Sequence, residues 1–235
     1  MDFYQINELA CECRNNWGVD LTGSIDVLSV VLNKNKNLTI VFLDMDENTS
    51  GACYKNHSQS VIFINSNHTK GRQFFSIAHE IYHLSYDDND FSICNLGSDD
   101  EIEKYANQFA SCLIMPNIAL NHYKMINNID KWDLDSIINC EQYFQISHHA
   151  LLCRLRYLGE ISYSEYVQLD CNVKYNANIR GYDSSLYEPY IGVNYTLGNY
   201  IRLVEKVHDK NLISRGKKEE FLLEAYLGDL VYNIP

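Results

Sequence analysis

The sequence has no run of apolar residues close to the roughly 18 that a membrane-spanning helix needs. Its first residues, Met1 to Gln5, also lack the basic stretch followed by an apolar stretch that marks an export signal. We therefore expect a soluble, cytoplasmic protein that makes no contact with a membrane.

Basic residues are scarce, because 19 Lys and Arg stand against 31 Asp and Glu, which gives a formal net charge of -12. A broadly negative field repels nucleic acid and anionic membrane surfaces. The composition therefore disfavours DNA binding.

No two cysteines have the Cys-x-x-Cys spacing of zinc ribbons and redox motifs, although the chain contains eight cysteines. The eight are scattered over a chain that is 46% apolar and long enough to fold around an ordinary core. A chain of this kind does not need disulfide bonds to be stable. We expect reduced thiols, as in a cytoplasm.

The order of helical and strand patterns predicts an α+β fold. Helical spacing in residues 1–35 indicates two helices, and three short β-type runs follow at residues 38–43, 51–54 and 60–64. Turn-forming residues separate these runs, so we expect a small antiparallel sheet. Two longer helices follow, the first from about Gly71 to Ser85 and the second from Ser98 to Pro116.

The second half of the chain is predicted to be mainly helical. Residues 134–158 have a helix-turn-helix pattern in which Ser147 is a plausible N-cap. Residues 163–199 are rich in Tyr, Asn and Gly and indicate an irregular connection, whereas the tail returns to helical spacing. We divide the chain into residues 1–125, a helix-turn-helix-like region at 126–162, and an irregular and helical segment at 163–235.

The first long helix contains His79-Glu80-Ile81-Tyr82-His83. Four positions along a helix are about 400° of rotation, so His79 and His83 lie on nearly the same face and can bind one metal ion. Glu80 is rotated by about 100° and would lie beside the open coordination position, where a general base is needed. The pattern therefore predicts a zinc peptidase site with Glu80 as base.

A catalytic zinc site needs a third protein ligand, and the second long helix offers several acids. Glu101 is explained by a capping box with Ser98, and Asp99 and Asp100 by their favourable position at a helix N-terminus. Glu103 instead shares a stripe with small residues that allow close helix packing, and Asn107 one turn later would orient its carboxylate. Glu103 is our choice of third ligand, although the pattern also fits a solvated first-turn acid.

Two strings of the sequence resemble the ImmA/IrrE family of metallopeptidases. They are Arg72 to His83 (RQFFSIAHEIYH) and Glu103 to Pro116 (EKYANQFASCLIMP), in the order and separation that the family has. The resemblance implies a zincin-like fold for residues 1–125 and implies that Glu103 is the third metal ligand. One departure is Tyr82, where the family usually has glycine.

The resemblance further implies an endopeptidase that cleaves a transcriptional repressor encoded nearby, often in mobile elements or stress circuits. The predicted metal is zinc, and manganese or iron suit the same ligands. Two alternatives stay open: a metal-binding regulator that acts through DNA or protein binding without proteolysis, and a toxin-antitoxin component. No pattern in the sequence specifies an oligomeric state.

The helix-turn-helix-like region has few of the cations that phosphate contacts require, since Arg154 and Arg156 are its only arginines. We expect it to have a structural or partner-docking role. His148 and His149 face different directions on a helix and make a poor ligand pair, so we interpret them as surface residues.

Overall fold

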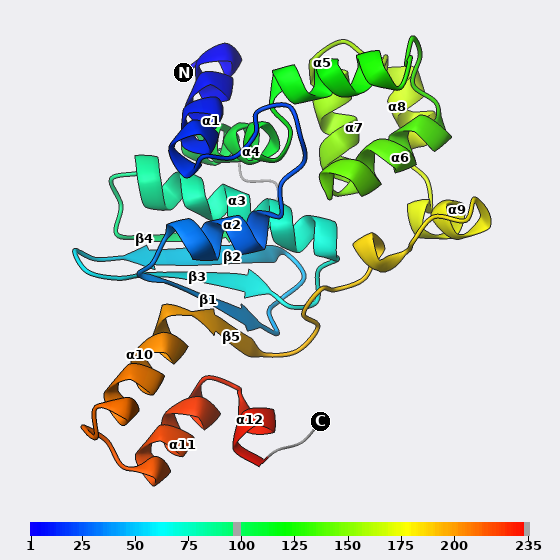
Figure 1. The fold of residues 1–235 in the computed structure, drawn as a ribbon. Helices are drawn as coiled ribbons and strands as arrows, with labels where there is room; N and C mark the ends of the chain where they lie inside the picture. Colours follow the sequence, from blue (N-terminus) through cyan, green and yellow to red (C-terminus); the bar gives the residue numbers. More distant parts are fainter. Residues whose placement is uncertain (96–99, 233–235) are drawn as a thin grey trace.

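We describe the protein from a computed structural model that places residues 1–95 and 100–232 (Figure 1). The elements that surround the sheet are α1 (Phe3–Trp17), α2 (Val27–Lys34), β1 (Leu38–Leu43), β2 (Thr49–Lys55), β3 (Ser60–Asn65), α3 (Lys70–Tyr86), β4 (Phe91–Asn95) and α4 (Glu101–Ile114). The remaining elements are α5 (Asn117–Ile126), α6 (Leu134–Phe144), α7 (His148–Tyr157), α8 (Tyr163–Leu169), α9 (Val173–Ile179), η1 (Ser185–Tyr187), β5 (Tyr195–Gly198), α10 (Asn199–Asp209), α11 (Arg215–Glu224) and α12 (Gly228–Tyr232). The predicted α+β class is confirmed.

The five strands form one sheet in the order β4-β2-β3-β1-β5. The prediction of an antiparallel sheet was wrong for one pair, because β1 and β3 run parallel, with Leu38 opposite Ser60. The other three pairs are antiparallel. The parallel pair arises because β2 forms a hairpin with the outer side of β3, which leaves β3 beside β1 in the same direction. Strand order of this kind is not encoded in the local apolar pattern that identified the strands.

Helix α3 packs across β2 and β3 on one side and against α4 on the other. Gln73 connects the first turn of α3 to the neighbouring segments. The side-chain amide of Gln73 donates hydrogen bonds to the carbonyls of Asn65, Ser66 and Ile191. Gly71 lies so close to the α6–α7 turn that an added Cβ would stand 2.9 Å from the backbone nitrogen of Ser147. Helix α3 is therefore held in place by the sheet, by α4 and by the turn between α6 and α7.

Helix α4 begins later than predicted. Its N-cap is Asp100, whose side chain accepts from the backbone N–H of Ile102, and Glu101 accepts from the hydroxyl of Tyr105. The predicted cap, Ser98, and its neighbour Asp99 lie outside the described residues. The predicted end is close, since the helix stops at Ile114 and Pro116 is the N-cap of α5.

The predicted helix-turn-helix is present as α6 and α7, and the hydroxyl of Ser147 caps α7 by accepting from the N–H of Ala150. Residues 163–199 are more regular than predicted. They contain α8, α9 and η1, and β5 pairs with β1 at the edge of the sheet. The prediction of an irregular connection was wrong because these elements are short and because β5 depends on a partner strand that lies far away in sequence.

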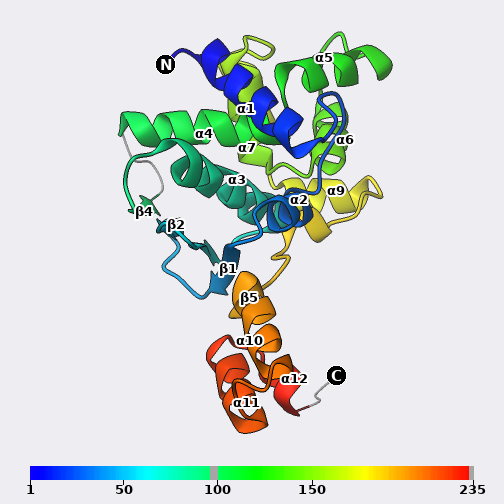
Figure 2. The same cartoon turned by 60° about the vertical axis from the view of Figure 1, so that its left-hand side comes forward.

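One hydrophobic core runs from α1 through the sheet, α3 and α4 to α7. Helices α10–α12 have a small core of their own made by Val204, Leu222, Ala225 and Leu227. They lie beyond β5, on the far side of the molecule from α5–α7 (Figures 1 and 2). The region limits at residues 125 and 162 stay predictions. Within the described ranges, no helix is both long and apolar enough to cross a bilayer.

Candidate metal centre

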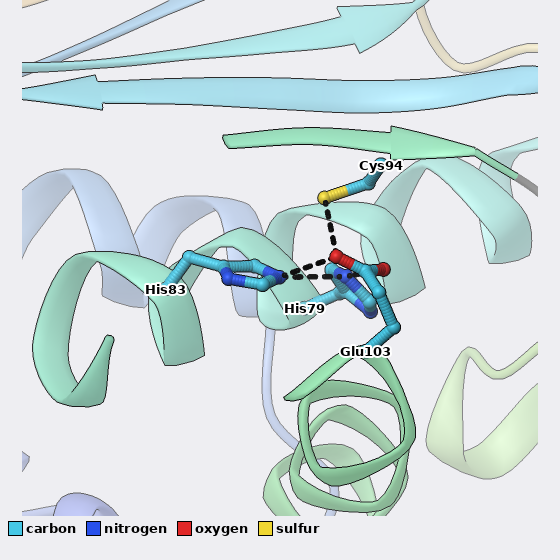
Figure 3. Close-up of side chains that lie close together, drawn as sticks. All are labelled: His79, His83, Cys94 and Glu103. Carbon is cyan, nitrogen blue, oxygen red and sulfur yellow. Dashed lines mark hydrogen bonds and ion pairs between the residues drawn. The ribbon is translucent and has the colours of Figure 1, made fainter. Parts of the chain in front are cut away.

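Helix α3 turns both predicted histidines toward one point. The Nε2 atoms of His79 and His83 lie 3.2 Å apart, and both side chains are buried. The 3.6-residue period of an α-helix produces this arrangement from a spacing of four residues. The two rings face α4 and the strand β4 (Figure 3).

Helix α4 supplies Glu103, whose carboxylate points between the two rings (Figure 3). Its oxygens lie 3.2 Å from His79 Nε2 and 3.3 Å from His83 Nε2. The buried Ala106 and Ala110 follow on the same helix, and small side chains at such positions allow two helices to approach closely. The structure thus brings together the three residues that were predicted as metal ligands.

Each histidine is oriented by a hydrogen bond at Nδ1, the ring nitrogen that faces away from the cluster. Nδ1 of His79 donates to the amide oxygen of Asn107 at 3.0 Å, and Nδ1 of His83 donates to the carboxylate of Asp87 at 3.0 Å. Asn107 had been expected to orient Glu103, so its partner was predicted wrongly. Asp87 was missed, although its position four residues after His83 on a helix was a usable signal. Both bonds leave the Nε2 lone pairs facing inward, as in metal-bound histidines.

Lys55 fixes the C-terminal end of helix α3 from the neighbouring strand β2. Its ammonium group donates to the carbonyls of His83, Leu84 and Asp87. These are carbonyls that a helix end leaves without internal partners, and a cation there also complements the helix dipole. The last turn of α3, which carries His83, is thereby held against the sheet.

Glu80 projects from α3 toward the sheet and is fully buried. Strand β2 accommodates it at Gly51, where an added Cβ would stand 2.8 Å from Oε1 of Glu80 and 2.8 Å from the backbone oxygen of Phe63. The thiols of Cys53 and Cys94 lie beside the carboxylate. Neither of its oxygens has a hydrogen-bond partner. Burial raises the pKa of Glu80, and the nearby His79, His83 and thiols only partly offset that effect.

The chain matches a peptidase family described as "IrrE N-terminal-like domain" over residues 33–156, more than half of its length. It belongs to this family. A search of curated proteins finds no significant match. The IrrE-like match includes the described strands except β5, helices α3 and α4, α6, and α7 up to Arg156.

The family implies a metal ion, and the donor set of this IrrE-like chain fits one. In a tetrahedral zinc site with bonds of about 2.0–2.1 Å, neighbouring ligand atoms lie about 3.3 Å apart. The two His nitrogens and the nearer oxygens of Glu103 are separated by 3.2 to 3.3 Å. Burial raises the pKa of Glu103, but the adjacent His79 and His83 outweigh it and lower that pKa to about 2. Such a buried anion beside two inward lone pairs is a favourable place for a cation.

A cavity of about 1000 Å³ opens beside this IrrE-like metal centre. His79 and its hydrogen-bond partner Asn107 lie in its wall, and residues of α7 and α9 also line it. Among the described residues that line it, none is acidic, whereas Arg72, Arg154 and Lys174 are basic. In a chain with a net charge of -12, this local excess of cations favours an anionic or polar ligand.

Two of the three basic side chains in the cavity wall already have partners. Arg154 donates to Ser111, Cys112 and Asn117, and Lys174 pairs with Glu188. Arg72 lies on the same helix as His79, seven residues earlier, and its side chain makes no ion pair within the described structure. Arg72 is therefore the basic group that is available to a ligand.

His148 was predicted to lie on the surface, and this was wrong. Its ring is buried between α6 and α8, where Nδ1 bonds to Glu141 and Nε2 donates to the backbone oxygen of Leu169. His149 is exposed, as predicted. The difference arises because the two side chains face different sides of α7, and only one of those sides meets α6.

Proposed function

We propose that this protein is a zinc-dependent endopeptidase in which His79, His83 and Glu103 hold the metal and Glu80 is the general base. The observation that carries the proposal is the position of Glu80. A fully buried carboxylate without a hydrogen-bond partner, next to an N₂O ligand set, is costly for folding unless it has a chemical role.

Zinc in this site would polarise a peptide carbonyl and lower the pKa of a water molecule toward about 7. Glu80 would take the proton from that water as the water oxygen attacks the carbonyl carbon. It would then deliver the proton to the amide nitrogen as the carbon–nitrogen bond breaks. A raised pKa suits this role, because it makes the carboxylate a better proton acceptor near neutral pH.

Zinc is our choice among the divalent metals because of the donor atoms. Two imidazole nitrogens and a carboxylate form one of the recurrent catalytic zinc sets. Manganese and iron bind the same ligands, with geometry and availability deciding between them. The buried thiol of Cys94 beside the set adds a soft donor, which favours zinc over manganese.

The surroundings of the site support a polypeptide substrate. Strand β4 has a neighbouring strand on one side only among the described strands, and it carries Cys94 at the site. The free side of an edge strand can pair with an extended peptide. The cavity next to the site then offers room for side chains, and Arg72 is placed to bind an acidic one.

We further propose that the substrate is a transcriptional repressor encoded nearby and that the protein acts in the cytoplasm. The resemblance to ImmA/IrrE proteins supports the first point, and eight free cysteines support the second. We propose that α6 and α7 have a structural or docking role instead of reading DNA. Arg154, one of the two arginines of this pair, is buried against Phe3 and Asn117 and is not free to contact phosphate.

Incubation of the full chain with the neighbouring repressor tests the proposal. We expect one specific cleavage that a chelator abolishes, that added zinc restores and that Glu80→Gln does not perform. An intact repressor under all conditions contradicts the proposed substrate, and equal cleavage by Glu80→Gln contradicts the proposed base.

A further inference from the structure

Cys94 is a fourth donor at the metal centre, on a different element from the others. It projects from β4 toward the two histidines and Glu103 (Figure 3). Its sulfur lies 3.8 Å from an oxygen of Glu103, and the four ligand atoms all lie within 4.8 Å of one another. The donors thus come from α3, α4 and β4 and form one cluster.

The surroundings of Cys94 differ from those of an ordinary core cysteine. Five cysteines are buried, and Cys13, Cys53, Cys112 and Cys140 all belong to the main hydrophobic core, whereas Cys94 does not. With an exposed fraction of only 1%, Cys94 faces polar groups instead. Ser92 and Glu103 lie within 3.9 Å of its sulfur, and the unpartnered carboxylate of Glu80 lies beside it.

Hydrophobic packing does not account for a buried thiol among carboxylates and imidazoles, whereas metal binding does. Zinc bound by two histidine nitrogens, one carboxylate oxygen and one thiolate sulfur has a complete tetrahedral set of ligands. The metal ion would also compensate the anionic charge of Glu103 next to the sulfur. The alternative is a thiol that donates a hydrogen bond to Glu103 and otherwise fills space between β4 and α4.

We propose that Cys94 is the fourth protein ligand of the resting metal site, so that the peptidase is latent until its sulfur is displaced. The inference rests on the proposed function, because it takes His79, His83 and Glu103 as the other ligands and Glu80 as the base. With a metal present, binding of the Cys94 sulfur would release the thiol proton to solvent and would take the coordination position that a water molecule would otherwise occupy. The site then lacks the water that Glu80 would deprotonate.

The position of β4 makes displacement feasible. As the edge strand it is held by β2 alone among the described strands, and its pairing with β2 contains an irregularity between Thr49 and Gly51. A substrate segment that pairs with the free side of β4 would shift the strand that carries the sulfur. Substrate binding would then both open the metal site and place the peptide next to it.

The direct test is X-ray absorption at the zinc edge of the wild-type full chain loaded with one zinc. We expect one sulfur neighbour at about 2.3 Å in addition to nitrogen and oxygen neighbours at about 2.0–2.2 Å. A spectrum with nitrogen and oxygen neighbours only would overturn the proposal. Because this measurement needs no variant, it does not depend on how substitutions fold.

Cobalt substitution with matched variants provides the second test. Cobalt-loaded wild type should show a thiolate-to-cobalt charge-transfer band in the near ultraviolet, and Cys94→Ser should lose it. Cys53→Ser is the control, since Cys53 is also buried and lies beside Glu80 but is not among the four clustered donors. A band that survives in Cys94→Ser, or that disappears in Cys53→Ser alone, contradicts the assignment.

Affinity and activity give the expected magnitudes. Cys94→Ala should bind zinc at least about tenfold more weakly, because it loses a ligand, yet should hydrolyse substrate faster at saturating zinc. Zinc binding without a sulfur neighbour, together with Glu80-dependent cleavage, would reject the latency and leave the proposed function intact. Failure to bind any metal would instead reject the proposed function itself.

Discussion

The carboxylate of Asp87 accepts a hydrogen bond from Nδ1 of His83 at 3.0 Å, and this bond sets which ring nitrogen faces the metal centre. The hydrogen bond also opposes the effect of burial and keeps the pKa of Asp87 below its ordinary value. An anionic partner of this kind holds the ring in place and increases its basicity as a ligand.

Replacing Asp87 should therefore weaken the metal site without removing a ligand. For Asp87→Ala we expect zinc affinity to fall about 10–100-fold, as is typical when such a partner is lost. Competition with a chromophoric chelator measures this. Asp88→Ala is the control, since Asp88 is exposed and should leave the affinity unchanged. Equal affinity of wild type and Asp87→Ala would show that the hydrogen bond has no part in metal binding.

Gly51 gives Glu80 the space that it occupies beneath β2. In Gly51→Ala the new Cβ would stand 2.8 Å from Oε1 of Glu80, so the carboxylate must move. A displacement of about 1 Å can reduce turnover about 100-fold, and we expect a fall in kcat of that order with zinc still bound. Gly216→Ala meets no atom within 4 Å and is the matched control. Undiminished kcat in folded, zinc-loaded Gly51→Ala would contradict the position of the base.

Arg72 should determine how well an acidic substrate segment binds. A hydrogen bond to a charged group contributes about 1.5–3 kcal/mol, so Arg72→Gln should raise KM at least about tenfold. We expect little change in kcat, because Arg72 is not part of the metal centre. Lys210→Gln removes one charge from an exposed position at the C-terminal end of α10, outside the cavity wall, and should leave KM unchanged. If the two variants raise KM equally, net charge and not the cavity is responsible.

The buried pair of His148 and Glu141 should make stability depend on pH. Burial opposes protonation of His148, but the hydrogen bond and charge of Glu141 outweigh it and raise the pKa of His148 above its ordinary value of about 6.5. The pKa of His148 is higher in the folded state than in the unfolded state. The stabilisation by this pair is therefore fully present at pH values below the unfolded-state pKa and is lost as the pH rises through the folded-state pKa.

Urea unfolding of wild type and His148→Gln at several pH values measures this effect. The free energy of unfolding should be greater for wild type than for the variant. This difference should be largest near pH 6 and should shrink as the pH rises. A difference that grows with pH would contradict the assigned direction. His57→Gln changes an exposed histidine far from this pair in the sequence and is the control.

The core of the site could be predicted because its ligands follow local rules. His79 and His83 meet through the helical period alone, and the string that begins at Glu103 resembles a known motif. The contributions of Cys94 and Gly51 were missed because both come from strands. Their closeness to α3 depends on the strand order, which places β4 outside β2 and makes β1 and β3 parallel. No periodicity within one segment contains that information.

Capping shows a second limit of sequence patterns. Ser98 and Asp100 both precede an apolar helical stripe and both are good N-caps, so composition alone does not choose between them. The structure uses Asp100 and leaves Glu101 to bond with Tyr105. His148 illustrates the same limit for burial, because α6 and α8 enclose it although the pattern of α7 gives no sign of them.

Metal analysis of the purified chain and of three variants tests the central claim most directly. The account predicts about one zinc per chain for wild type, the same for Glu80→Gln, and no stoichiometric metal for His79→Ala or His83→Ala. Glu80→Gln separates the base from the ligands, because it should retain zinc and lose only cleavage. Wild type without stoichiometric metal, or a His83→Ala variant that binds zinc as tightly as wild type, would contradict the claim that α3 and α4 form a metal site.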